Sequence, residues 1–274
     1  MNVSIYYFSG TGNTAWVVSR LAKQLAALGD SVDVASCEGI AAQEVDPAAC
    51  DVMGIAFPVH ASFAPRVFRR FLRGLPEGGG RPLFALTTAA YASGDTAWHA
   101  ARPLRDKGYT LFLADNVMMG NNLHLPRVSP LPVASPERMA EKRAQALVKI
   151  EKLAALIHHR RRHIRGRDPL GWLLGVSQRV GYERLIAAVF DGFWADETCT
   201  QCGWCISRCP MHNIEMAEQG VVFGDACILC MRCYSFCPVH AIQATEKSRD
   251  AAKYRRYQGP EGKPYGHVHR DQAE

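Results

Sequence analysis

MNVSIYYFSGTGNTAWVVSRLAKQLAALG, residues 1–29, is the stretch that decides the fold. Residues 2–8 are rich in β-forming side chains, and the loop Ser9-Gly10-Thr11-Gly12-Asn13-Thr14 follows them. Apolar residues then recur at helical spacing up to Gly29, at Trp16, Val17, Leu21, Leu25 and Leu28. A strand, a glycine loop and a helix in this order predict the first unit of a parallel α/β sheet.

Further strands are expected at 32–36, 51–57, 82–88 and 109–117, with helices near 65–74 and 96–107. The strands read as near-continuous apolar runs and alternate with helices, which predicts a parallel sheet covered on both faces. Five such strands suit a doubly wound α/β sheet in the flavodoxin-like order 2-1-3-4-5.

The pattern changes near residue 130, where prolines interrupt it, and a long charged helix is expected from 137 to about 163. The segment 131–195 holds 12 basic and 6 acidic residues, so the net charge of +6 is concentrated there. We expect four units: an α/β domain at 1–130, a basic, amphipathic helical linker at 131–195, a cysteine-rich α+β domain at 196–245 and an extended polar tail at 246–274.

The linker carries a second amphipathic pattern from Pro169 onward. Its apolar residues are Leu170, Leu173, Leu174, Val180, Leu185, Ile186, Val189, Phe190 and Phe193. A helix with such a stripe must bury it, and we expect it to dock on a flanking domain. The basic run 158–167 is interpreted as a solvated helix end, or as a patch that docks an acidic domain or partner. Contact with an anionic membrane surface is a less favoured alternative, and nucleic acid is not expected.

Composition excludes several classes of protein. The 274 residues are 48% hydrophobic and 21% charged, which indicates a globular chain. No apolar run reaches the roughly 18 residues of a membrane-spanning helix, and no basic segment precedes an apolar one at the start, so we expect a cytoplasmic protein. Eight of the ten cysteines lie between 199 and 237, which is a layout of metal ligands rather than of disulfides. Cys37 and Cys50, the other two, are interpreted as inert buried thiols.

The eight clustered cysteines form an internal repeat at an offset of 28 residues, and each copy reads Cys-x2-Cys-x2-Cys-x3-Cys-Pro. In this bacterial iron–sulfur run three thiolates hold one [4Fe–4S] cluster and the fourth ligates the other cluster. Zinc sites give no reason for the third and fourth cysteines or for the Cys-Pro step. His212 and His240 are interpreted as surface residues. The crossed ligation predicts Cys199, Cys202, Cys205 and Cys237 on one cluster, and Cys227, Cys230, Cys233 and Cys209 on the other. This segment resembles the two-cluster bacterial ferredoxins.

The loop from Ser9 to Thr14 opens a helix, where free backbone N–H groups and the helix dipole favour a phosphate. A nucleotide triphosphatase is excluded because no lysine lies between residues 9 and 22. The pattern Gly10-x-Gly12-x-x-Ala15 also satisfies a dinucleotide fingerprint, with Glu38 as the ribose-binding acid. Hydroxyls among the glycines instead favour a monophosphate, and the loop closely resembles that of flavodoxins. The residues expected at the phosphate are Ser9, Gly10, Thr11, Gly12, Asn13 and Thr14.

Two later loops decide in favour of FMN, because a flavin ring needs flanking surfaces at the ends of the third and fourth strands. The first loop offers Pro58, Val59, His60 and Ala61, and the second offers Thr87, Tyr91, Gly94 and Asp95. The second resembles the flavodoxin loop whose tyrosine stacks on the ring, which makes Tyr91 the stacking candidate. Flavodoxins often carry Trp or Tyr in the first loop, where this chain has His60. Both residues also have a purely structural interpretation, as a strand cap and a satisfied loop histidine.

A flavodoxin-like domain followed by a helical insert and a two-cluster ferredoxin resembles the EFR1-type ferredoxins of anaerobic and related bacteria, over most of the chain. The resemblance implies an electron carrier that passes electrons between FMN and two [4Fe–4S] clusters and on to redox partner proteins, such as ferredoxin- or flavodoxin-dependent oxidoreductases. One alternative is an enzyme that reduces a quinone or similar molecule at the flavin, with His60 and Asp95 as acid–base candidates. A redox sensor is another. Internal transfer within one chain and transfer across a homodimer both stay open.

Overall fold

The computed structural model describes residues 1–129, 131–180, 182, 186 and 190–265. Within these residues the α/β part forms a six-stranded parallel sheet in the order β2-β1-β3-β4-β5-β6. The strands are β1 (Asn2–Tyr7), β2 (Ser31–Ser36), β3 (Val52–Pro58), β4 (Pro82–Ala89), β5 (Thr110–Met118) and β6 (His163–Ile164). The flavodoxin-like order 2-1-3-4-5 is confirmed. The sixth strand was not expected, because two residues carry no periodicity that a sequence could reveal.

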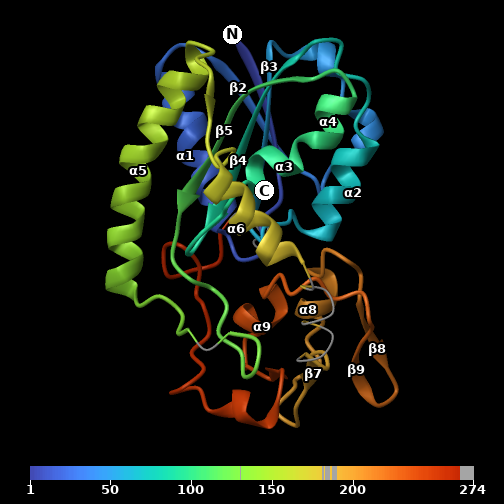
Figure 1. Ribbon diagram of the computed structural model, residues 1–274. Helices are drawn as coiled ribbons and strands as arrows, with labels where there is room; N and C mark the ends of the chain where they lie inside the picture. Colours follow the sequence, from blue (N-terminus) through green and yellow to red (C-terminus); the bar gives the residue numbers. More distant parts are fainter. Residues whose placement is uncertain (130, 181, 183–185, 187–189, 266–274) are drawn as a thin grey trace.

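Helices cover both faces of the sheet (Figure 1). One face carries α1 (Asn13–Ala27) and α5 (Pro136–His158), and the other carries α2 (Arg66–Gly74), α3 (Thr96–Ala100) and α4 (Arg102–Asp106). The single helix expected at 96–107 is two helices, because Pro103 lies in the first turn of α4 and cannot donate to a preceding turn. Two short 3-10 helices, Ala42–Glu44 and Pro47–Ala49, connect β2 to β3.

Helix α5 begins one residue before the expected start at 137 and ends earlier than expected. The hydroxyl of Ser135 accepts a hydrogen bond from the backbone N–H of Arg138 at 3.2 Å. The helix stops at His158 rather than near 163, because the chain turns through Arg160, at φ +49°, into β6. In β6, His163 and Ile164 pair with Leu113 and Ala114 of β5.

Helix α6 (Pro169–Arg179) does not bury its apolar stripe as the sequence suggested. Leu170, Leu173 and Val180 are 74%, 58% and 75% exposed, so the expected burial is wrong at these positions. Glycines make the contact instead, since Gly171 and Gly175 lie close against Gly94. Farther along the stripe, Ile186 and Phe190 pack on the core of the cysteine-rich domain, whereas Leu185 and Val189 lie outside the described residues.

The cysteine-rich domain lies below the carboxyl ends of the parallel strands (Figure 1). Its described part holds two antiparallel pairs, β7 (Trp194–Ala195) with β10 (Ile242–Gln243) and β8 (Ile214–Ala217) with β9 (Gly220–Phe223). Short helices α8 (Trp204–Ser207) and α9 (Arg232–Phe236) lie in the two repeats, and a 3-10 helix spans Glu246–Arg249. A separate hydrophobic core, which includes Tyr234 and Ile242, supports this small domain.

The described part of the tail, 246–265, returns to the first helix of the α/β domain. The indole N–H of Trp16 donates to the carboxylate of Glu261 at 2.8 Å, and Arg20 forms an ion pair with the same carboxylate at 2.9 Å. The Tyr265 hydroxyl meets that of Ser19 at 3.2 Å. The last nine residues of the tail expected at 246–274 lie outside the described residues. Among the helices that the structure describes, none combines the length and the apolar character that crossing a membrane would require.

Candidate cofactor site

A cavity of about 370 Å³ opens where the carboxyl ends of the strands face the cysteine-rich domain. Ligand pockets typically occupy about 300–1,000 Å³, so this volume falls within their range. The expected residues that line it are Ser9, Gly10, Thr11, Asn13, Thr14, Pro58, Val59, His60, Ala61 and Tyr91. Parallel strands place their following loops at one edge, which is why residues so far apart in the chain meet here.

The phosphate loop is held in shape by its own hydroxyls. Ser9 Oγ accepts hydrogen bonds from the backbone N–H groups of Gly12 (3.1 Å) and Ala15 (3.3 Å). Thr14 Oγ1 and Thr88 Oγ1 are 2.8 Å apart. Gly12 has a φ of +101°, which L side chains rarely adopt, so glycine is needed at this turn. The first turn of α1 contains no acidic residue, and its leading N–H groups have no acceptor within the helix, so the loop fits an anion such as a phosphate.

Tyr91 and His60, the two residues expected to flank the flavin ring, both line the cavity but have different surroundings. Tyr91 lines it with a side chain that is 56% exposed, which leaves an aromatic face available for stacking. His60 lines the opposite loop and its backbone pairs with Phe63. Burial, followed by the positive charge of Arg69, lowers the pKa of His60 to about 4. The imidazole is therefore neutral near pH 7.

Four expected residues do not line this cavity: Gly12, Thr87, Gly94 and Asp95. Asp95 is 2% exposed and forms a two-pronged ion pair with Arg179 of α6, which also donates to the Ser62 carbonyl at 3.3 Å. Gly94 packs against the glycines of α6. Gly94 and Asp95 therefore contact this helix, and neither lies at the cavity where a flavin ring was expected. The hydroxyl of Thr87 is buried without a hydrogen-bond partner among the described residues, whereas the neighbouring Thr88 lines the cavity.

Three groups of lining residues were missed. Asn121 and Asn122 belong to the segment after β5, and Asn122 donates to Thr11 Oγ1 at 2.6 Å. This segment follows the buried strand β5, so its place at the carboxyl edge of the sheet could have been predicted from the sequence. The other two groups come from the linker (Gln178, Tyr182 and Ile186) and from the cysteine-rich domain (Leu229, Cys230 and Met231). Their place depends on how the domains dock, which no local pattern reveals.

The cysteines fall into two groups. Burial, then the neighbouring Cys237 thiol, raises the pKa of Cys205 to about 11, and Cys199 adds to the shift. Burial is also the main cause that raises the pKa of Cys233 well above its usual value. After burial, the largest causes at Cys233 are Cys230, Cys227 and Cys209, in that order, and Cys205 contributes least. Cys237 therefore lies near Cys205 of the first repeat, and Cys209 lies near Cys227, Cys230 and Cys233 of the second.

Backbone N–H groups support these thiols at equivalent places in both repeats. Asn213 donates to Cys209 Sγ at 3.4 Å, and Ala241 donates to Cys237 Sγ at 3.3 Å. No three His, Cys, Asp or Glu side chains of the described residues lie close enough together to hold a single metal ion. A [4Fe–4S] cube is larger than an ion, and neighbouring thiols such as these fit its donor chemistry.

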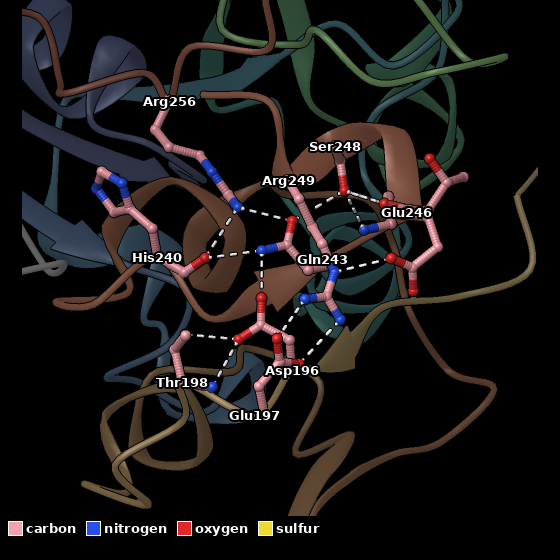
Figure 2. Close-up of polar contacts among 11 residues, drawn as sticks. Asp196, Glu197, Thr198, His240, Gln243, Glu246, Ser248, Arg249 and Arg256 are labelled. Carbon is pink, nitrogen blue, oxygen red and sulfur yellow. Dashed lines mark hydrogen bonds and ion pairs between the residues drawn. The ribbon is translucent and has the colours of Figure 1, made fainter. Parts of the chain in front are cut away.

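A polar network fastens the loop after Cys237 (Figure 2). The Gln243 amide donates to Asp196 at 2.8 Å and to the His240 carbonyl at 3.0 Å. Arg256, from the tail, donates to the same carbonyl at 3.1 Å and to Gln243 Oε1 at 3.1 Å. Its guanidinium also lies 3.4 Å from the centre of the Tyr234 ring. The tail thus holds the loop that follows Cys237.

The two domains touch at the phosphate loop itself. A Cβ on Gly10 would lie 2.4 Å from the carbonyl oxygen of Cys230, so the two backbones are in contact. Arg232, 2% exposed, donates to the carbonyls of Ser9 (2.8 Å) and Gly10 (3.1 Å) and binds both carboxylate oxygens of Glu38 at 2.8 Å. Glu38 is therefore engaged by an arginine, and not free for a ribose as the dinucleotide interpretation required.

The comparisons with known proteins agree with this division. The profile of a family described as a 4Fe-4S dicluster domain matches residues 193–238. The chain thus joins a sheet with the flavodoxin-like strand order to a segment that is similar to 4Fe-4S dicluster domains. No curated protein matched the sequence.

Solved structures similar to the chain include oxidised flavodoxin 2 from Bacillus cereus, with 17% identity, a TM-score of 0.43, and 58% of this chain and 99% of that one covered. Two-electron reduced Megasphaera elsdenii flavodoxin is 22% identical with a TM-score of 0.38, and the match covers 54% of this chain and 98% of that one. A flavodoxin from the domain Archaea is 15% identical with a TM-score of 0.36, and the match covers 57% of this chain and 99% of that one.

Proposed function

We propose that this chain is an electron-transfer flavo-iron–sulfur protein, which carries electrons between FMN and two [4Fe–4S] clusters and on to a redox partner protein. It is a candidate member of the EFR1-type ferredoxins. One observation carries the proposal: Cys230, an expected cluster ligand, lines the same cavity as the phosphate loop and Tyr91. A flavin supplies the exchange between two-electron and one-electron chemistry, and the protein sets the positions and potentials of the groups it binds.

The residues divide the work of binding. The N–H groups of Asn13 and Thr14 at the start of α1, with the Thr11 hydroxyl, would bind the phosphate. The ring of Tyr91 stacks on one side of the flavin, and the loop with His60 flanks it on the other. The crossed sets of four cysteines hold the two clusters.

The electron-carrier interpretation is favoured over an enzyme that reduces a small molecule at the flavin. Such an enzyme needs a proton donor over the ring. With a pKa of about 4, His60 is neutral near pH 7 and cannot act as an imidazolium acid. Asp95 is bound by Arg179 and lies outside the cavity lining. Neither acid–base candidate is therefore available for this role.

Anaerobic purification with cofactor counting tests the proposal. We expect one FMN and, from two cubes, about eight iron and eight sulfide per chain. Light-driven reduction of the flavin should then bleach the iron–sulfur absorbance in the same molecule. Stoichiometric zinc, FAD in place of FMN, or a single cluster would contradict it.

A further inference from the structure

The two cysteine repeats have the same backbone but unequal surroundings, and the difference concerns the second cysteine of each. Gln201 and Leu229 occupy equivalent positions and both have positive φ, at 54° and 52°. Two residues later, Gly203 and Met231 have φ of 73° and 65°. The cysteine between each pair, Cys202 or Cys230, is thus presented by the same turn in both repeats.

The surroundings of these equivalent turns are opposite. Leu229 and Met231 are 7% and 3% exposed, and with Cys230 they line the cavity at the phosphate loop. Gln201 and Cys202 are exposed to solvent. Met231 keeps a backbone conformation that side chains rarely adopt, where the first repeat uses glycine. Such strain persists where the surrounding structure holds it and is a mark of functional sites.

The residue that follows Gly203 or Met231 explains why only the second turn is bound to the α/β domain. It is Trp204 in the first repeat, half-buried beside Phe236, and Arg232 in the second. Arg232 binds Ser9, Gly10 and Glu38, and it also donates to the carbonyl of Arg208 in the first repeat at 2.8 Å.

The charge of Arg232 is held in place despite its burial. Burial opposes the charged form, but the hydrogen-bonded Glu38 carboxylate outweighs it, so the pKa of Arg232 is raised. The guanidinium also lies within electrostatic reach of the Cys230 and Cys209 thiols. Both belong to the same expected set of cluster ligands, so one cation faces the phosphate loop and that set together.

We propose that the cluster set of Cys209, Cys227, Cys230 and Cys233 exchanges electrons directly with the flavin site, that Arg232 is the positioning residue for this step, and that the set containing Cys202 faces the external partner. The proposal rests on the proposed function and adds the order of the route to it. Overall, one reduced flavin and two oxidised clusters give one oxidised flavin and two clusters that have each gained one electron. The protons released from the flavin ring pass to solvent.

Arg232→Gln and Arg232→Lys in the full chain test the first half of the route, with Arg249→Gln as control. Arg249 is an arginine of the tail whose partners, Glu197 and Glu246, lie on the surface. A light flash reduces the flavin, and the iron–sulfur absorbance reports the first-order rate of internal transfer. We expect Arg232→Gln to slow it about tenfold or more with iron and flavin contents kept, because small displacements of reacting groups are costly. Arg232→Lys should fall between Arg232→Gln and the wild type.

A second readout separates positioning from mere support. In a redox titration followed by electron paramagnetic resonance, Arg232→Gln should shift the midpoint potential of one cluster to a more negative value, because a nearby cation stabilises the reduced state. The shifted signal should be the one that Cys227→Ser removes. Equal rates in Arg232→Gln and Arg249→Gln, or a shift in the other cluster, would overturn the assignment.

The external half of the route is tested with ferricyanide, a small anionic oxidant. Gln201→Glu should slow its second-order reaction with the reduced protein at low salt and leave the internal rate unchanged. Unchanged ferricyanide kinetics would refute an exit beside Cys202. A wild-type protein without flavin or without clusters would instead refute the proposed function, so the two failures are distinguishable.

Discussion

Glu38→Gln removes the carboxylate that neutralises Arg232 while it keeps the size of the side chain. Breaking a buried ion pair by removing one partner costs about 3–5 kcal/mol when both groups are fully buried. Here the Arg232 side chain is 3% exposed and that of Glu38 is 18% exposed, and Arg232 keeps three backbone carbonyls. We therefore expect a smaller loss, about 2–3 kcal/mol, in the free energy of opening the interface.

Native-state amide hydrogen exchange on the anaerobic, cofactor-loaded protein measures this loss. Amides of helix α9, which begins at Arg232, report the opening of the interface, because exchange requires their hydrogen bonds to break. A loss of about 2–3 kcal/mol corresponds to exchange roughly 30- to 150-fold faster. Amides of β4 and β5, in the centre of the sheet, should be unaffected, since they do not depend on the docked domain.

Glu197→Gln is the matched control, since it breaks another glutamate–arginine pair in the cysteine-rich domain. Glu197 is 71% exposed and Arg249 is 35% exposed, and a surface pair of this kind contributes at most about 1 kcal/mol. If Glu38→Gln accelerates exchange in α9 no more than Glu197→Gln does, the buried pair does not hold the domains together. The reasoning from burial would then be refuted.

Three further predictions concern the cavity. Gly10→Ala should weaken flavin binding and lower the thermal stability, because the added methyl meets the Cys230 carbonyl at 2.4 Å, whereas Gly39→Ala, whose nearest neighbour is 3.8 Å away, should leave both unchanged. Thr11→Glu should abolish flavin binding without unfolding the sheet, because a carboxylate would repel the phosphate; circular dichroism and flavin fluorescence check the two parts. The lowered pKa of His60 means that between pH about 6.5 and 4 the unfolded chain binds a proton that the folded chain does not. The free energy of unfolding should therefore decrease as the pH is lowered through that window, and it should decrease by less in His60→Gln, as denaturant titrations would show.

Local patterns were enough to predict the first five strands of the sheet and ten of the residues that line the cavity. The strand and glycine loop of residues 2–14 carry both the periodicity and the turn residues of a β-α unit. They predicted β1, α1 and the cavity lining by Ser9, Gly10, Thr11, Asn13 and Thr14. The repeat of the cysteines predicted that Cys237 lies near Cys205 and that Cys209 lies near Cys233, and the full crossed ligand sets stay a prediction. Both signals act within a few residues or within one repeat, which is the range that sequence patterns describe.

Contacts between units were not predictable in the same way. Asp95 and Glu38 looked like ligand-binding acids, yet each is paired with an arginine from a later segment, Arg179 and Arg232. A sequence pattern normally predicts that a charged residue inside a helix or a cysteine run is exposed to solvent. Its burial follows only from the place where the domain docks. The predicted burial of the apolar stripe on α6 was wrong for a related reason. The closest approach of two backbones is made by small glycines and not by the large apolar side chains.

The doubled cysteine run also hides an asymmetry that matters more than its symmetry. Two identical repeats would present two equivalent cysteines, and an electron would have no preferred direction through them. Replacing a glycine and a tryptophan of the first repeat by Met231 and Arg232 in the second makes one turn apolar and anchored. Its counterpart at Gly203 keeps solvent access at Cys202. Because the anchored turn is the one that touches Gly10, the repeats acquire an inner and an outer end, and a route from cavity to surface follows from that difference.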